Sequence, residues 1–460
     1  MVAKSLLFQN TRRIESLLAS FFMAVAFCLS LRWHFQGFII SITFLTALVF
    51  STRSPIYAVS VTIIFYICRP WEVVEANEWW LQIPRWCIWV WLLSWLRNKS
   101  EGVTESPCFL IATRGFFLIF TLGIWAGLTI IFSGDPNQSF QFYVDTLLRA
   151  LILVVVIGLS VQKQKDVRFL CYSFAIGVAT LSIFSIWRYH GFDQPLQIPF
   201  IREDQNFAER RLEAVGSLGN SNDIAAVVLI PLGFLWPVLF SKKENVIKWA
   251  IAVAISTLLM TAILASQSRG ALIAAVAQCG VYFVSRAHKP ARLGLLILIV
   301  IGFLTPLANR VMGRDMADLD ASTNSRMNYY ITGLRMALYS PIWGQGFGRY
   351  PFEFERFSLA TVHEWGHRTA HSSWILVLSE TGVIGFILFS AIHLRMFKIC
   401  WEVRKTLPGL LLALSGYSIT IVFLSHSWLM FPWILFSLIE LAKITIERET
   451  NHAKKRKVVL

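Results

Sequence analysis

The chain has 460 residues, of which 56% are hydrophobic and only 15% charged, and its mean hydropathy is +0.59. A soluble domain carries about 25% charged residues, so this composition excludes an ordinary soluble protein. Apolar runs recur along the chain at about the length that crosses a hydrocarbon core of about 30 Å. Short alternating segments, typical of spanning strands, do not occur in the sequence. We therefore expect an all-α, polytopic bundle of about 12–14 transmembrane helices.

The net charge of +15 at first suggests a nucleic-acid partner. However, Lys and Arg fall largely in alternate short connectors and at both termini, which is the pattern that the positive-inside rule describes. It predicts cytoplasmic termini and no nucleic-acid binding. The seven Cys are scattered singly, and no pair has the spacing of a disulfide framework or a metal site.

The expected spans, in chain order, are 17–31, 35–50, 55–68, 86–97, 115–132, 146–161, 168–187, 223–240, 248–266, 270–285, 292–308, 372–394, 408–424 and 428–445. An N-terminal bundle thus covers 1–308 and includes an outer loop at 188–222. Residues 309–371 form a large polar loop with short helices, which the charge pattern places outside the cytoplasm. Residues 372–460 hold the last spans and a basic cytoplasmic tail.

Arginine recurs near the expected outer ends of spans, at Arg149, Arg210, Arg211, Arg269 and Arg326. One arginine at a span boundary often anchors its helix by reaching to the interface. Several on one side of the membrane favour a site for an anionic ligand, because the planar guanidinium donates two parallel hydrogen bonds to a phosphate.

Asn220, Asn222 and Asp223 precede the span that starts near Ile224. Residues of this type cap helix N-termini. Capping and contact with a ligand are compatible roles, and the sequence leaves both open.

The large loop contains the string His363-Glu364-Trp365-Gly366-His367, which matches the zinc motif H-E-x-x-H. On a helix the two His would share one face and bind zinc, with Glu364 as the base. Gly366 disfavours that helix by about 1 kcal/mol, and no third ligand has the familiar spacing. We interpret the string as a coincidence and expect no metal or other cofactor, with a membrane zinc metalloprotease as an alternative.

Gly344, Gly346 and Gly348 punctuate the same loop. They resemble the start of a phosphate-cradling loop, but a dinucleotide fingerprint requires a preceding strand. Here a helix-like stretch and Ser340-Pro341 come first. The pattern favours a tight reversal that needs positive φ angles.

His371 and Glu380 are the expected catalytic residues. His371 lies where the large loop enters a span, and an imidazole titrates near neutrality and can accept a proton from a hydroxyl. Glu380 lies nine residues further on, within that span. It either orients the site or is a buried carboxylate that is hydrogen-bonded inside the bundle.

Four strings in sequence resemble the O-antigen ligase and O-antigen polymerase superfamily of bacterial envelope glycosyltransferases. They are GSLGNSND (216–223), SRGA (268–271), NSRMNYYITGLRMALYSPIWGQGFG (324–348) and HSSWILVLSETGVIG (371–385). The resemblance covers about 205–395 and the layout of many spans, and it leaves ligase and polymerase open.

This resemblance implies an inner-membrane enzyme, with both termini cytoplasmic and no metal requirement. It would transfer a glycan from an undecaprenyl diphosphate carrier to an acceptor hydroxyl on the periplasmic face. Its diphosphate would be bound by Arg210 or Arg211, Arg269 and Arg326, with His371 in catalysis. A transporter of lipid-linked sugars is the other alternative, although its polar groups would spread through the bilayer depth.

Overall fold

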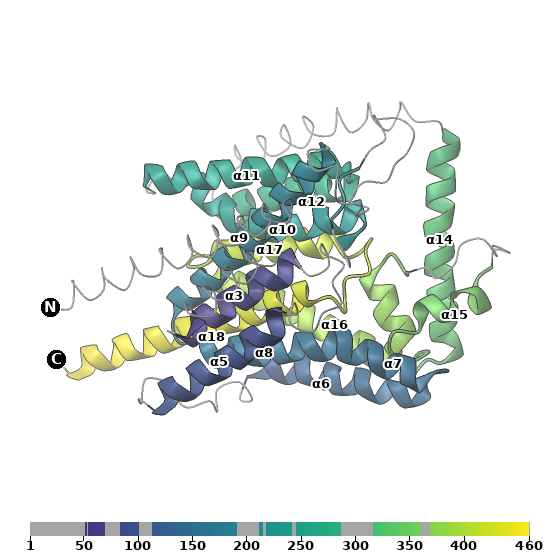
Figure 1. Cartoon of the computed structure of the whole chain (residues 1–460), viewed down its shortest axis with the longest axis horizontal. Helices are drawn as coiled ribbons and strands as arrows, with labels where there is room; N and C mark the ends of the chain where they lie inside the picture. Colours follow the sequence, from purple (N-terminus) through teal and green to yellow (C-terminus); the bar gives the residue numbers. More distant parts are fainter. Residues whose placement is uncertain are drawn as a thin grey trace, which may run out of the picture. The chain divides into compact units, whose positions relative to one another are not determined.

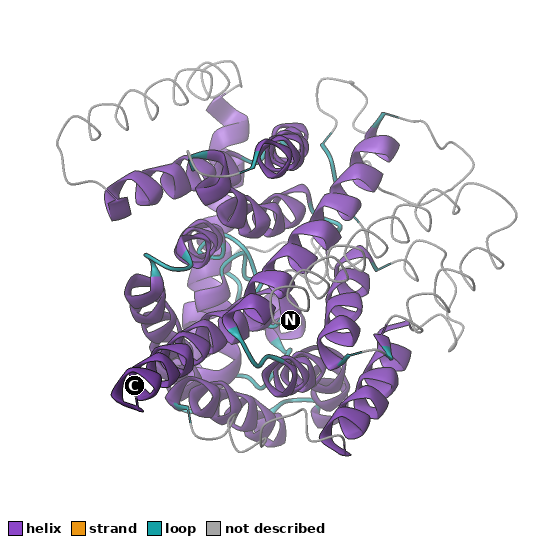
Figure 2. Cartoon of the chain, turned by 90° about the vertical axis from the view of Figure 1, so that its left-hand side faces the viewer, coloured by secondary structure: helices purple, strands orange, loops and turns teal. Residues whose placement is uncertain are grey.

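The computed structural model describes residues 51–52, 54–69, 83–100, 113–190, 211–214, 218–241, 245–286, 316–359 and 369–459. Within these ranges the regular elements are helices and none is a strand (Figure 2). The predicted all-α class is therefore confirmed. The predicted spans 17–31, 35–50 and 292–308 lie outside the described residues.

Figure 1 labels the helices. They are α3 (Pro55–Cys68), α5 (Ile83–Ser100), α6 (Arg114–Thr129), the 3-10 helix η3 (Ile130–Phe132), α7 (Pro136–Tyr143), the π-helix η4 (Val144–Leu148), α8 (Arg149–Ser160), α9 (Gln164–Tyr189), α10 (Ser221–Leu239), α11 (Val246–Ser266), α12 (Arg269–Arg286), α14 (Met316–Tyr339), α15 (Tyr350–Phe357), α16 (Ser373–Val403), α17 (Pro408–Thr420) and α18 (Met430–Val459).

Six helices in the described ranges are long and apolar enough to cross a membrane. They are Arg114–Phe132, Pro136–Ser160, Gln164–Trp187, Ser221–Leu239, Val246–Ser266 and Ser373–Val403. Two shorter apolar helices cover Pro55–Cys68 and Arg269–Ser285. The chain is a multi-pass membrane protein, and the total of about 12–14 spans stays a prediction.

Several helices extend beyond their predicted limits, and for two of them the local sequence gives the reason. The span predicted to start at residue 146 begins at Pro136, because Asp135 caps the helix by accepting from the Gln138 N–H at 3.1 Å and Pro136 suits the first turn. Most of the predicted connector 133–145 is therefore helical. Likewise, α16 continues past residue 394 to Val403, since its basic end contains no helix breaker.

By its internal contacts the chain forms two compact units. The first comprises Met1–Pro107, Val156–Ser268 and Ile444–Leu460, and the second comprises Cys108–Val155 and Arg269–Lys443. In the first unit α3 packs against α9 and α5, and α10 packs against α9 and α11. Buried polar contacts join these helices, such as Ser60 Oγ to Ser173 Oγ at 2.7 Å and Trp91 Nε1 to Ser160 Oγ at 2.7 Å.

In the second unit α16 is the common partner of several helices. It packs against α6, α14 and α17, while α12 packs against α17. Arg395 of α16 also pairs with the buried Glu440 of α18 through two hydrogen bonds, of 2.5 and 3.2 Å. A paired charge of this kind avoids the cost of a lone charge inside a helix bundle.

Helices α6 and α16 each carry a row of exposed apolar side chains. The rows are Phe117, Ile124 and Leu128 on α6, continued by Ile131 of η3, and Val383, Ile387 and Leu394 on α16. Spacings of three, four and seven residues place each row on one side of its helix. In a membrane-spanning bundle such rows are the lipid-facing surface.

Candidate active site

Helix α16 is interrupted ten residues after it begins. Gly382 has φ 67° and ψ −169°, values outside the helical region, so the helical hydrogen bonds are broken around it. The segment 341–346 replaces them: the N–H groups of Gln345 and Gly346 donate to the carbonyls of Ser379 and Glu380 at 2.8 and 3.1 Å. The Val383 N–H in turn donates to the Pro341 carbonyl at 2.8 Å. Backbone groups at membrane depth need such partners, so this docking stabilises the break.

The docked segment is the glycine-rich reversal predicted from the sequence. Gly344, Gly346 and Gly348 have φ angles of 68°, 95° and 74°, in the region that glycine adopts without strain. A side chain at Gly344 would clash with the backbone of Glu380, and one at Gly346 would clash with Ser133. The prediction of a tight reversal is confirmed.

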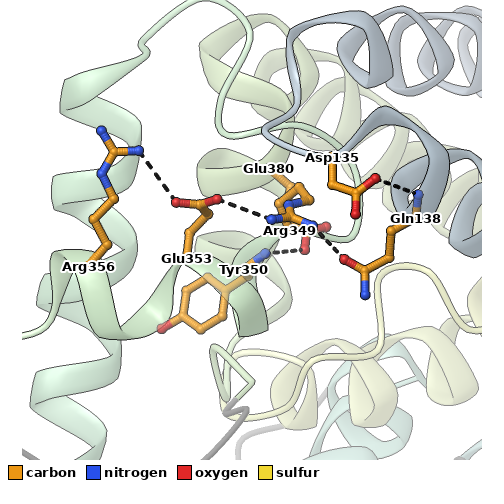
Figure 3. A network of polar contacts seen from close by, with 7 residues as sticks. All are labelled: Asp135, Gln138, Arg349, Tyr350, Glu353, Arg356 and Glu380. Atoms are coloured by element: carbon orange, nitrogen blue, oxygen red, sulfur yellow. Dashed lines mark hydrogen bonds and ion pairs between the residues drawn. The ribbon is translucent and has the colours of Figure 1, made fainter.

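The Glu380 side chain lies beside this break and is 1% exposed. Its Oε1 accepts from the Tyr350 N–H at 3.1 Å, a contact drawn in Figure 3, and its Oε2 accepts from the Trp428 indole N–H at 2.7 Å. Both carboxylate oxygens therefore have a buried donor, which offsets the cost of burying the group.

Tyr350 connects this buried carboxylate to α14. Its hydroxyl donates to the Tyr329 carbonyl at 2.7 Å. Burial, with nearby Tyr329 and Glu380, raises the pKa of Tyr350 well above its ordinary value. The hydroxyl thus remains a hydrogen-bond donor at physiological pH. The ring of Tyr329 lies against the imidazole of His371, with centroids 5.0 Å apart.

His371 has an unusual backbone. Its φ of 46° lies in the left-handed region, which costs a non-glycine residue about 1–2 kcal/mol. The next residue, Ser372, caps α16 by accepting from the Ile375 N–H at 3.4 Å. The Tyr330 hydroxyl donates to the His371 carbonyl, also at 3.4 Å. Strain held in place by surrounding contacts is characteristic of functional sites.

Arg326 lies one helical turn before Tyr330 on α14 and is exposed. Burial raises the pKa of the Tyr330 hydroxyl, and the charge of Arg326 counteracts this rise. The structure thus brings three predicted site residues into one region of the second unit. The charge of Arg326 acts on Tyr330, whose hydroxyl contacts the His371 carbonyl, and Glu380 is connected to His371 through Tyr350 and Tyr329.

A second polar network, also in Figure 3, lies at the start of α15. The buried Arg349 donates to Gln138 Oε1 at 2.5 Å and pairs with Glu353 at 3.2 Å, and Glu353 also pairs with Arg356 at 3.5 Å. This network fixes α15, and hence Tyr350, against the capped start of α7. No local pattern in the sequence marks Arg349 or Tyr350, since both gain their roles only through partners that are distant along the chain.

The other predicted residues are more dispersed. Arg149 pairs with Asp145 and lies inside the helix that starts at Pro136. Arg269 is the first residue of α12, after the left-handed Gln267 that ends α11. Arg210, His363, Glu364 and His367 lie outside the described residues.

The remaining candidates belong to the first unit. Asn220 caps α10, with its side chain accepting from the Asn222 N–H at 2.9 Å, and Asp223 stands in the first turn. The capping interpretation is confirmed for Asn220. Arg211 directly precedes Leu212, whose N–H donates to the Ala265 carbonyl at 3.0 Å.

The described part of the chain holds no cluster of three or more His, Cys, Asp or Glu that could bind a metal ion. The model of one protein family, described as O-antigen ligase, matches residues 251–390. No curated protein matches the chain. The matched segment contains Arg269, Arg326, His371 and Glu380, so the family that the sequence resembles is confirmed for the segment that carries the site.

Proposed function

We propose that this chain, whose residues 251–390 match the O-antigen ligase family model, transfers a glycan from an undecaprenyl diphosphate carrier to an acceptor hydroxyl. The family makes it an O-antigen ligase-like membrane glycosyltransferase. The carrier, the acceptor and the location of the reaction on the periplasmic face of a bacterial inner membrane are parts of the proposal. The observation that carries it is the family match over the segment that places Arg326, His371 and Glu380 around shared tyrosines.

In the proposed reaction the bond between the anomeric carbon and the diphosphate oxygen breaks, and undecaprenyl diphosphate leaves. The acceptor hydroxyl oxygen forms the new glycosidic bond and gives its proton to the neutral imidazole of His371. The proton then passes from His371 to water. The left-handed backbone of His371 and the Tyr329 ring support this role, since they fix where the imidazole lies.

The diphosphate leaving group needs positive charge at the transition state. Arg326 is exposed next to the Tyr330–His371 contact, which suits it to a phosphate. Arg210, Arg211 and Arg269 are proposed as further diphosphate ligands on the strength of the motif alone. Arg149 is proposed as a supporting residue, with its charge partly compensated by Asp145.

Glu380 is proposed as a positioning residue. Its carboxylate is buried, with each oxygen accepting from an N–H group, and this arrangement suits holding a structure better than exchanging protons with a substrate. It holds the backbone of Tyr350, whose hydroxyl holds Tyr329 against His371.

The test is glycan transfer by the purified protein in vesicles that contain an undecaprenyl diphosphate-linked glycan, with product and released undecaprenyl diphosphate both measured. Arg326→Lys keeps the charge but loses the planar fork, so we expect weaker donor use with unchanged acceptor use. Arg335→Lys, on the same helix, is the matched control. If the transfer rate depends on donor concentration in the same way in wild type and Arg326→Lys, Arg326 does not bind the diphosphate.

Neither alternative function is favoured by an observation on the described residues. A zinc metalloprotease would rest on His363 and His367. We expect chelators to leave glycan transfer unchanged and His363→Ala to retain it. Stoichiometric zinc that is lost in His367→Ala, together with proteolytic activity, would replace the transferase proposal.

A further inference from the structure

Helix α14 carries an apolar stripe on the side opposite its buried face. Met327, Leu334, Leu338 and, just past the helix end, Ile342 are 55%, 44%, 79% and 50% exposed. Their spacing of seven, four and four residues places them on one side of the helix axis. The opposite side buries Thr332 and Met336, each 0% exposed. One face of α14 is therefore covered by the rest of the protein, and the exposed apolar face needs another covering.

The stripe is continuous with the lipid-facing surface of the spans. Ile342 belongs to the segment that docks into the break of α16 at Gly382. Val383, which follows Gly382, is exposed and belongs to the lipid-facing row of α16. Trp343, the neighbour of Ile342, stacks on Phe132 at 4.0 Å between ring centroids. Phe132 follows Ile131, which is 69% exposed in the lipid-facing row of α6.

Helix α14 also lies near the level at which α16 enters the membrane. The span predicted at 372–394 begins at the first turn of α16, and Tyr329 and Tyr330 of α14 contact His371 just before that turn. Trp125 stacks on Trp343 at 4.8 Å, which adds two indoles beside the stripe. Tryptophan is enriched where the acyl chains meet the head groups. In Figure 1, α14 runs crosswise to the span α6 of the same unit, and thus along the membrane plane.

Cationic side chains accompany the stripe. Arg335 follows Leu334, and Arg356, which is 57% exposed, lies over the ring of Tyr339 at 5.0 Å. Basic residues beside an apolar face are the signature of a helix that lies in an interface with anionic lipid.

We propose that α14 is an interfacial helix whose stripe of Met327, Leu334, Leu338 and Ile342 is covered by the lipids of the bilayer. The helix then rests on lipid with one face and holds Tyr329 and Tyr330 against His371 with the other. This contact sets the height of His371 above the acyl chains. The inference concerns the lipid contact alone and stands apart from the chemistry that His371 performs.

The experiment uses the full chain in vesicles of phosphatidylethanolamine and phosphatidylglycerol. An environment-sensitive fluorophore is attached at Leu338→Cys, at Leu334→Cys and, as a control, at Glu355→Cys on the exposed side of α15, with labelling of the unmutated chain subtracted. The two stripe labels should lose most of their fluorescence to lipids that carry a quencher on the acyl chain, and little to aqueous iodide. The Glu355 label should show the reverse.

Iodide quenching of both stripe labels to the extent seen at Glu355 would overturn the proposal, because the stripe would then face water. Protection from both quenchers that disappears when the protein is diluted into more lipid would also overturn it, in favour of a second copy of the chain. Because two stripe positions are labelled, failure of one variant to fold leaves the other to decide.

Discussion

Glu380 and His371 belong to the same helix start, yet their surroundings suit them to different tasks. The carboxylate of Glu380 is enclosed and accepts one N–H on each oxygen. His371 is partly exposed, with the Tyr330 hydroxyl on its backbone carbonyl and the Tyr329 ring against one side of its imidazole. A group that exchanges protons with a substrate has to be accessible to it. We therefore expect substitution of His371 to affect the transfer rate and substitution of Glu380 to affect stability.

The imidazole of His371 is expected to carry the proton transfer. General-base assistance is typically worth a factor of about 10²–10⁴, so His371→Ala should lose that much transfer rate while donor binding persists. His371→Gln should be nearly as impaired if the proton moves to the ring, and largely active if the ring only positions the acceptor. Transfer at near wild-type rate by His371→Ala would move the base elsewhere.

The hydroxyl of Tyr350 is expected to act through Tyr329. Tyr350→Phe removes one hydrogen bond, worth about 1 kcal/mol, and keeps the buried ring. We expect kcat to fall by about fivefold with KM unchanged, because about 1 kcal/mol of lost transition-state stabilisation corresponds to that factor. Tyr417→Phe, which removes another buried hydroxyl that contacts His426, is the control. Equal losses in both variants would mean a general effect on stability.

The carboxylate of Glu380 is expected to stabilise the fold. Glu380→Gln places an NH2 group opposite one of two N–H donors, so one buried donor loses its acceptor at a cost of about 1–3 kcal/mol. Thermal unfolding in detergent should show a lower Tm than for Glu402→Gln, which changes a carboxylate that is 40% exposed and pairs with Lys443. An unchanged Tm would show that Glu380 is not needed to hold the break.

At the scale of one element, the break in α16 requires glycine. In Gly382→Ala the new Cβ would clash with the Ile342 carbonyl, and the φ of 67° would strain any other side chain. We expect little folded protein in the membrane fraction. Gly270→Ala in α12 is the matched control, because a Cβ there meets nothing within 4 Å. Normal levels of Gly382→Ala would show that α16 can close into a continuous helix.

The sequence predicted elements well where length and apolarity decide them. The predicted span 55–68 coincides with α3, and the span 248–266 differs from α11 by two residues. It predicted less where a polar segment continues an apolar helix, as Pro136–Tyr143 does before η4 and α8. The break at Gly382 was also hidden, because a glycine within an apolar run gives no sign of the partner that fills the gap.

For the candidate site, the sequence singled out His371, Glu380 and Arg326, whose roles stay predictions, but none of the residues that lie between them. Tyr350 and Trp428 lie 30 and 48 residues from Glu380 along the chain. These two contacts form only when the glycine reversal docks on α16. No local sequence pattern therefore predicts them. Trp428 in particular stands in a short connector without a motif around it.

At the scale of the whole molecule, the charge pattern predicts that the two ends of α16 lie on opposite sides of the membrane. Cysteines at Glu355 and Lys405, both exposed, should therefore be labelled from opposite sides. In intact cells a membrane-impermeant reagent should reach Glu355→Cys alone, and Lys405→Cys should react only after lysis. The reverse pattern would place the candidate site in the cytoplasm and remove the proposed chemistry.

The docked reversal also bears on how the protein is made. Residues 341–346 leave the ribosome before Ser379–Val383, yet they supply the partners for the carbonyls of Ser379 and Glu380 and for the Val383 N–H. When α16 is inserted, its backbone has either to form a continuous helix or to meet a reversal that is already shaped by Gly344 and Gly346. Membrane insertion of this helix and folding of the segment before it are thus one biosynthetic step. A nascent chain that is arrested before residue 379 would hold the reversal without the carbonyls of Ser379 and Glu380 that it docks against.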